Sequence, residues 1–142
     1  MSSTLKGSPT FFLQPSAELM AFAKRQIRNV SPYLGTERRM ERREFVVLPV
    51  NALSIDEALR PLGPPLAMVT HSLSLWGIGL IHEHPLSHDL LALRLVVQGD
   101  EELVVGAVHW RKSLGPFNMC GCEVIARLDQ FPTAPFGESR NR

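Results

Sequence analysis

The sequence has few of the residues on which several classes of protein depend. Only two of its 142 residues are cysteine, which excludes a fold held together by several disulfides. No apolar run reaches the roughly 18 residues that a membrane-spanning helix needs. The first residues lack the charged start and long apolar centre of a secretory signal. We therefore expect a soluble, cytoplasmic protein.

Recognisable catalytic motifs are also absent from the sequence. It holds no GxSxG, no P-loop and no zinc-protease motif, and its 14 acidic residues are scattered along the chain. Nucleophilic or acid–base catalysis needs a nucleophile beside a base, or two carboxylates in one cleft. We therefore expect a protein without enzymatic activity.

Residues that commonly bind metal ions gather in one place. His82 and His84, with His88 nearby, would share a face if this segment were an extended strand. No further cluster of cysteine and histidine completes a closed site of four ligands. The two cysteines lack CxxC spacing, and reduced thiols are the default in a cytosolic protein. We expect neither a metal nor a cofactor.

Positive charge is concentrated in one segment of the chain. The net charge is +1, yet residues 24–43 hold seven basic and two acidic residues, a net +5. The remaining residues hold eight basic and twelve acidic ones, a net −4. Six of the seven bases are arginines, whose planar guanidinium groups pair two-fold with phosphate and stack on bases. The segment indicates a focused anion site, although a solvated basic linker has the same composition.

Nucleic acid is one anion that such a segment could bind. Aromatic residues make up only 7% of the chain, and no predicted strand carries the aromatic ladder on which proteins stack single-stranded bases. We therefore rank nucleic-acid binding last among the hypotheses.

An amphipathic helix precedes a β-rich region. Ser16 can cap the helix, apolar residues then recur at helical spacing, and Ser31-Pro32 ends it. We expect its apolar face to dock on the domain, on a partner protein or on a second copy of the chain. We divide the chain into a flexible N-terminus, this helix, an arginine-rich linker, a β domain and a flexible tail, at residues 1–15, 16–31, 32–44, 45–130 and 131–142.

The β domain has short apolar runs separated by turn residues about every ten positions. Leucines and a valine alternate along 90–97, which is typical of a strand with one buried face. Six strands with little helix indicate a small antiparallel barrel or a sandwich. We predict them at residues 45–55, 67–74, 77–84, 90–97, 102–111 and 117–128.

Two segments could form a ligand site together. The first is the arginine-rich run at 38–43, just before the first predicted strand. The second is 72–80, a strand end, a tight turn and a new strand. Gly77 and Gly79 permit close backbone approach or a positive φ there. Ser72 and Ser74 would point the same way in an extended segment, offering hydroxyl groups beside backbone amides.

These segments, in this order, resemble the PilZ domain family. The resemblance covers about residues 37–130 and includes the ending at 105–128. It implies a six-stranded antiparallel β-barrel, preceded here by the N-terminal helix, that binds the bacterial second messenger cyclic di-GMP. The family's RxxxR motif falls on Arg39 and Arg43 or on the overlapping pair Arg38 and Arg42, and its (D/N)xSxxG motif on Ser72, Ser74 and Gly77.

The sequence departs from the second motif at its first position. Ser72 stands where the family has Asp or Asn, and losing a charge-assisted hydrogen bond to guanine costs about 1.5–3 kcal/mol. Two hypotheses follow. The chain is a cyclic di-GMP receptor that signals when its arginine loop closes on the barrel, or it is a degenerate barrel that binds no nucleotide and serves as an adaptor or oligomerisation module.

Overall fold

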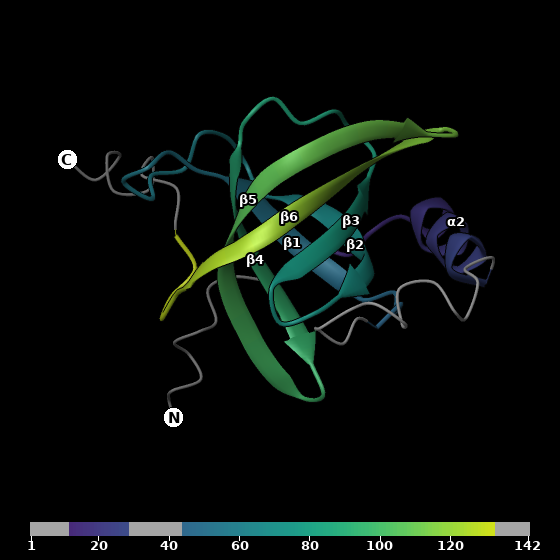
Figure 1. The fold of residues 1–142 in the computed structure, drawn as a ribbon, viewed down its shortest axis with the longest axis horizontal. Coiled ribbons are helices and arrows are strands. Elements are labelled where there is room, and N and C mark those ends of the chain that lie inside the picture. The colour runs from purple at the N-terminus through teal and green to yellow at the C-terminus, as the bar shows by residue number, and fades with distance from the viewer. Residues whose placement is uncertain (1–11, 29–43, 133–142) are drawn as a thin grey trace.

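A computed structural model describes residues 12–28 and 44–132, and in these ranges six strands close into one antiparallel barrel (Figure 1). Neighbours around the ring follow the order β1-β2-β3-β6-β5-β4, and β4 pairs with β1 to close it. The expected six-stranded barrel with an N-terminal helix is confirmed. The strands are β1 (Pro49–Ser54), β2 (Leu66–Leu73), β3 (Gly77–His82), β4 (Leu90–Val97), β5 (Asp100–Leu114) and β6 (Phe117–Arg127).

Alternating side chains of the six strands fill the barrel. In β4, Leu91, Leu93 and Leu95 are at most 2% exposed, because every second residue of a strand points to the same face. They meet inward residues of the other strands in one apolar cluster. Its buried members are Val50, Ala52, Met68, Ile78, Leu80, Leu86, Leu91, Leu93, Leu95, Val104, Cys120 and Cys122.

Helix α2 (Ala17–Arg28) packs on the outside of the barrel beside β2 and β3 (Figure 1). Ser16 caps it as expected, since its Oγ accepts a hydrogen bond from the amide of Leu19 at 3.1 Å. The Ser16 hydroxyl also donates to Glu83, just beyond β3, at 2.7 Å. Buried residues of the helix meet outward residues of the sheet: Leu19, Phe22, Ala23, Val69, Ile81 and Met119.

Two hairpins extend further than their sequences suggested. The turn between β4 and β5 is Gln98-Gly99, with φ of 53° and 86°, the geometry of a type I′ hairpin. The strands predicted at 90–97 and 102–111 implied a longer connection here. The turn after β5 is only Gly115-Pro116, shorter than the gap between the predicted strands 102–111 and 117–128, since Leu114 and Phe117 pair and pack against the α2 cluster.

The chain enters the barrel along β2. β1 begins at Pro49 and not at residue 45, and the first position of a strand is one that a proline, which lacks an amide hydrogen, can occupy. The stretch before it is held by Thr70, whose Oγ1 accepts from the amide of Leu48 at 2.9 Å and donates to the carbonyl of Val46. The described ranges include no helix of the length and apolarity that crossing a membrane would take.

Candidate ligand site

The structure places part of the predicted site. Ser72, Ser74 and Gly77 lie together at the end of β2, in the turn and at the start of β3. The four predicted arginines, Arg38, Arg39, Arg42 and Arg43, lie outside the described residues. The structure therefore describes only the barrel side of the predicted site.

Ser74 organises the turn between β2 and β3. Its Oγ accepts hydrogen bonds from the amides of Gly77 at 3.0 Å and Trp76 at 3.3 Å. Its own amide donates to the carbonyl of Gly77 at 2.9 Å. A serine at this position thus satisfies the amides of a tight turn. Neither Gly77 nor Gly79 has a positive φ, and only at Gly79 does the structure show a close neighbour, the Oγ of Ser72.

Ser72 starts a row of residues that crosses four strands on the outer face of the barrel. It pairs with Gly79 of β3, Gly79 pairs with Gly121 of β6, and Gly121 pairs with Trp110 of β5. The residues flanking Gly79 and Gly121 belong to the barrel core, so the row itself faces outward. We call Ser72, Gly79, Gly121 and Trp110 the glycine row.

Close neighbours leave no room for a side chain at either glycine of the row. A Cβ at Gly79 would lie 2.9 Å from the Oγ of Ser72, which is itself only 5% exposed. A Cβ at Gly121 would lie 2.3 Å from Nε1 of Trp110. The indole ring therefore lies directly over Gly121 while 45% of the Trp110 residue stays exposed.

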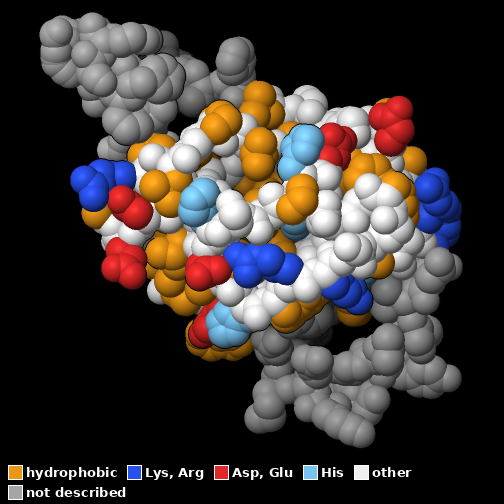
Figure 2. All heavy atoms as spheres, turned by 90° about the horizontal axis from the view of Figure 1, so that it is seen from above, with side chains coloured by type: hydrophobic (Ala, Val, Ile, Leu, Met, Phe, Trp, Pro, Cys, Tyr) orange, Lys and Arg blue, Asp and Glu red, His pale blue; other side chains and the backbone are white. Residues whose placement is uncertain are grey.

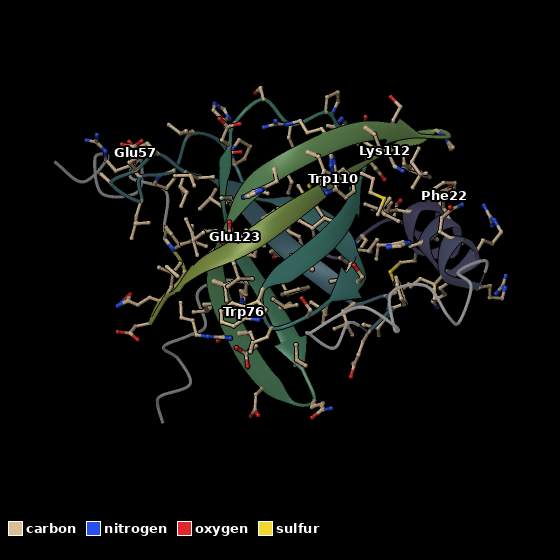
Figure 3. All side chains as sticks on the ribbon, viewed as in Figure 1. Phe22, Glu57, Trp76, Trp110, Lys112 and Glu123 are labelled. Atoms are coloured by element: carbon tan, nitrogen blue, oxygen red, sulfur yellow. The ribbon has the colours of Figure 1, made fainter. Side chains whose placement is uncertain are left out.

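Trp110 was not singled out as a site residue by sequence reasoning. In Figure 3 it lies where β5 and β6 run side by side. The ammonium group of Lys112 is 5.9 Å from its ring centroid, and His109 pairs with Glu123 at 2.9 Å beside it. An exposed indole next to a cation can stack a planar base. The signal that identifies Trp110 is its pairing with Gly121 across the two strands, and this pairing follows only from the register of β5 and β6.

A β-bulge lies at each end of the glycine row. The register between β2 and β3 shifts between Thr70 and Ser72, and that between β5 and β6 shifts between Val108 and Trp110. Each bulge inserts one residue and turns the following side chain to the other face. Thr70, which pairs with the core residue Leu80, therefore does not share its face with Ser72.

The residue after the arginine segment is fixed beside the motif. Glu44 and Leu73 form an antiparallel bridge, in which each amide donates to the other's carbonyl at 2.8 Å. Leu73 lies between the two motif serines. Next to this bridge, the rings of Phe45 and His71 meet edge to face at 5.7 Å. The start of the described barrel domain is thus held where the motif lies.

A cavity of about 420 Å³ opens at the barrel end next to the same turn. Inward-facing apolar residues form its walls, among them Leu73, Ile78 and Val104. At its mouth Arg127 and Glu102 form an ion pair at 2.7 Å. We call this the end cavity.

The histidine and cysteine patterns do not form a second site. β3 ends at His82, so the alternation assumed for His84 stops there; His82 Nδ1 instead bonds to the carbonyl of His84 at 2.7 Å. Within 12–28 and 44–132, no three metal-binding side chains gather. The thiol of Cys122 hydrogen-bonds to Cys120 inside the barrel, which lowers the pKa of Cys120 and raises that of Cys122.

No known protein family and no curated protein matches the sequence. Among solved structures, the Bacillus subtilis inhibitor of motility, MotI/DgrA, is similar, with a TM-score of 0.51 and 16% sequence identity. The match covers 65% of this chain and 44% of that one, so this chain corresponds to less than half of that protein's length. In fold, the chain is similar to part of a motility inhibitor.

Proposed function

We propose that this chain is a receptor domain for cyclic di-GMP. The observation that carries the proposal is the bridge between Glu44 and Leu73, because it fixes the end of the arginine segment beside the serine–glycine motif. The resemblance to PilZ domains pairs these same two features. The fold shared with part of a motility inhibitor is compatible with such a barrel.

Chain geometry supports the joint use of the two motifs. Arg43 directly precedes Glu44, and Arg39 lies four residues further back. At no more than about 3.6 Å per residue, the Cα of Arg39 stays within roughly 18 Å of that of Glu44. Guanidinium groups so close to the motif can pair with the two phosphates of a cyclic dinucleotide.

The glycine row supplies the complementary surface. Ser72 lies at one end, where its side chain is buried, and Trp110 offers an exposed ring at the other. The absence of side chains at Gly79 and Gly121 lets Ser72 and Trp110 lie close against the sheet. Guanine can stack on the indole or on an arginine, while Lys112 adds positive charge beside the ring.

Signalling in this proposal is a shift between two states of the arginine segment. Ligand binding stabilises the state in which the arginines contact the barrel. The same segment joins the barrel to α2 in the sequence, so the helix can respond to the ligand. A ligand shifts such an equilibrium only by its difference in affinity for the two states.

Isothermal titration calorimetry with cyclic di-GMP tests the proposal. Wild type should bind saturably, and Arg39→Ala and Arg43→Ala should each abolish the heat because each removes a charge-assisted contact. Arg60→Ala is the matched control, since Arg60 pairs only locally with Asp56. No saturation at several hundred micromolar ligand would contradict the proposal and favour the adaptor hypothesis.

Restoring the family's acidic residue tests the motif from the other side. Ser72→Asp should tighten cyclic di-GMP binding about ten-fold or more, since a carboxylate accepts guanine donors more strongly than a hydroxyl group does. Ser72→Asn is the uncharged control and should have a smaller effect. Parallel titrations compare them with wild type, and equal affinity of all three would remove Ser72 from the site.

A further inference from the structure

Helix α2 covers the outer face of the sheet directly beside the glycine row. Two residues along each strand from the row lie Ile81 in β3, Met119 in β6 and Lys112 in β5, and these pair in register. They face outward like the row, because every second residue of a strand points to the same side. Ile81 and Met119 belong to the apolar cluster that α2 forms with the barrel. The helix therefore borders the surface on which the proposed ligand would lie.

The tip of the β5–β6 hairpin also reaches the helix. Figure 1 shows this hairpin extending past the barrel on the side where α2 lies. The rings of Phe117 and Phe22 meet with their centroids 5.0 Å apart. A Cβ at Gly115, in the turn, would lie 3.4 Å from the Phe22 ring. Phe22 is buried, and it is the residue through which the helix contacts the hairpin tip.

Trp110 lies on the same hairpin, beyond its last pairing with β4. The described residues pair β5 with β4 only as far as Ala107, and the amide of Val108 donates to the carbonyl of Asp89 at 2.8 Å. A bulge follows, and from Trp110 onward β5 pairs on one side only, with β6. We call residues 109–117 the arm. Because it follows a bulge and has one neighbouring strand, the arm depends on further contacts for a fixed position.

One polar and one apolar contact hold the arm. Arg111 donates to the carboxylate of Asp89 at 2.8 Å and to the carbonyl of His88 at 2.7 Å. The Asp89 side chain is 81% exposed, and exposed ion pairs add little stability. Figure 2, seen from above, shows basic, acidic and histidine side chains lying among one another on this side of the molecule. Phe22 and Phe117 instead meet in the apolar cluster, where aromatic packing stabilises more.

We propose that α2 positions Trp110 through the contact of Phe22 with Phe117, so that the stacking surface for a base is complete only while the helix is docked. The docked helix holds the tip, and β5 transmits this restraint to Trp110, which stays against Gly121. In Figure 3, Trp110, Lys112 and Phe22 follow one another toward α2. Phe22 and Phe117 are thus positioning residues.

The link between helix and indole stands by itself, whereas its effect on a bound base rests on the proposed function. If the nucleotide stacks on Trp110, removal of α2 from the barrel weakens nucleotide binding. By thermodynamic linkage, the bound nucleotide then favours the docked helix by the same factor. A protein that binds the apolar face of α2 would therefore compete with the nucleotide.

Tryptophan fluorescence tests the link without any ligand. The chain has two tryptophans, so Trp76→Phe leaves Trp110 as the reporter. In this background Phe22→Ala should shift the emission to longer wavelength and increase quenching by acrylamide, because the indole becomes more exposed to water. Phe22→Leu should keep most of the original signal.

A matched control separates this link from a general loss of stability. Leu128→Ala removes an apolar side chain from the cluster on another face of the barrel, and it should leave the Trp110 signal unchanged. Circular dichroism shows whether each variant is folded. Phe117→Leu, a smaller change in the same contact, replaces Phe22→Ala if that variant loses the barrel, and its signal should shift in the same direction.

Calorimetry with cyclic di-GMP tests the effect on the site. Phe22→Ala should weaken binding about five-fold or more, as expected when a base loses a stacking contact. In a Trp110→Ala background the same substitution should change the affinity little, because both substitutions act through the same indole. A merely structural role of Phe22 would weaken binding equally in both backgrounds.

Two results would overturn the proposal. The first is an unchanged Trp110 signal in the folded Phe22→Ala variant, whether or not the chain binds nucleotide. The second is an equal loss of affinity with and without Trp110. A wild-type chain that binds no cyclic di-GMP but shows the fluorescence shift would remove the proposed function and support the link between α2 and Trp110.

Discussion

At the scale of single residues, the glycine row shows how much of this surface depends on missing side chains. Gly79 and Gly121 lie beneath Ser72 and Trp110, and a Cβ at either one would fall within 3 Å of its neighbour. Such contacts force the neighbour or the strand to move. The row therefore couples the identity of each glycine to that of the residue over it.

This coupling predicts a rescue between Gly79 and Ser72. Gly79→Ala should lower the free energy of unfolding by about 1–2 kcal/mol, because its methyl group meets the Ser72 hydroxyl in a buried position. In a Ser72→Ala background the same change should cost clearly less. Urea denaturation of the four proteins gives the coupling energy. Equal costs in both backgrounds would show that the hydroxyl contact is not the cause.

At the scale of elements, α2 is attached to the barrel by its start as well as by its apolar face. The Ser16 hydroxyl serves the helix and Glu83 at once. Arg25 lies over the ring of Phe22, and that ring contacts Phe117 with centroids 5.0 Å apart. The stretch before the helix is tied down too, as Leu13 exchanges two hydrogen bonds with the Asn51 side chain.

Removal of the cap should loosen this attachment. Ser16→Ala deletes the bond to the Leu19 amide and the one to Glu83, and should lower the free energy of unfolding by about 1 kcal/mol. Urea denaturation followed by circular dichroism measures it. Ser87→Ala, at an exposed loop serine, is the control. Equal stability of the two variants would mean that the helix start contributes nothing to the attachment.

The elements also show what sequence reasoning could and could not reach. Alternation along β4 and the cap at Ser16 are local patterns, and both are confirmed. The face on which Ser72 lies could not be obtained this way, because the bulge at His71 changes the parity of the strand. The place of Trp110 over Gly121 depends on pairing between strands and a second bulge. Both are properties of register, which no single strand encodes.

At the scale of the whole molecule, the barrel encloses both thiols. Cys120 is fully buried and Cys122 is 5% exposed, and both belong to the central apolar cluster. The lowered pKa of Cys120 follows from the hydrogen bond that Cys122 donates. A lowered pKa makes the Cys120 thiol more reactive, whereas its burial keeps reagents in solution from reaching it.

We expect burial, and not the lowered pKa, to determine how fast the cysteines react in the native protein. Native protein should react with Ellman's reagent far more slowly than a free thiol, and both cysteines should react at once in denaturant. Absorbance at increasing urea concentration measures the rate, which should follow the unfolding transition. Rapid labelling of one thiol in the native protein would show that the reagent reaches the barrel interior without unfolding.

Closure of the sheet has a consequence for how the molecule opens. Each described strand has a hydrogen-bonded neighbour on both sides, so no strand can peel away without breaking two ladders. Amide protons of all six strands should therefore exchange with deuterium in one collective event. Those of α2, which are bonded only within a 12-residue helix, should exchange through a separate and less costly opening.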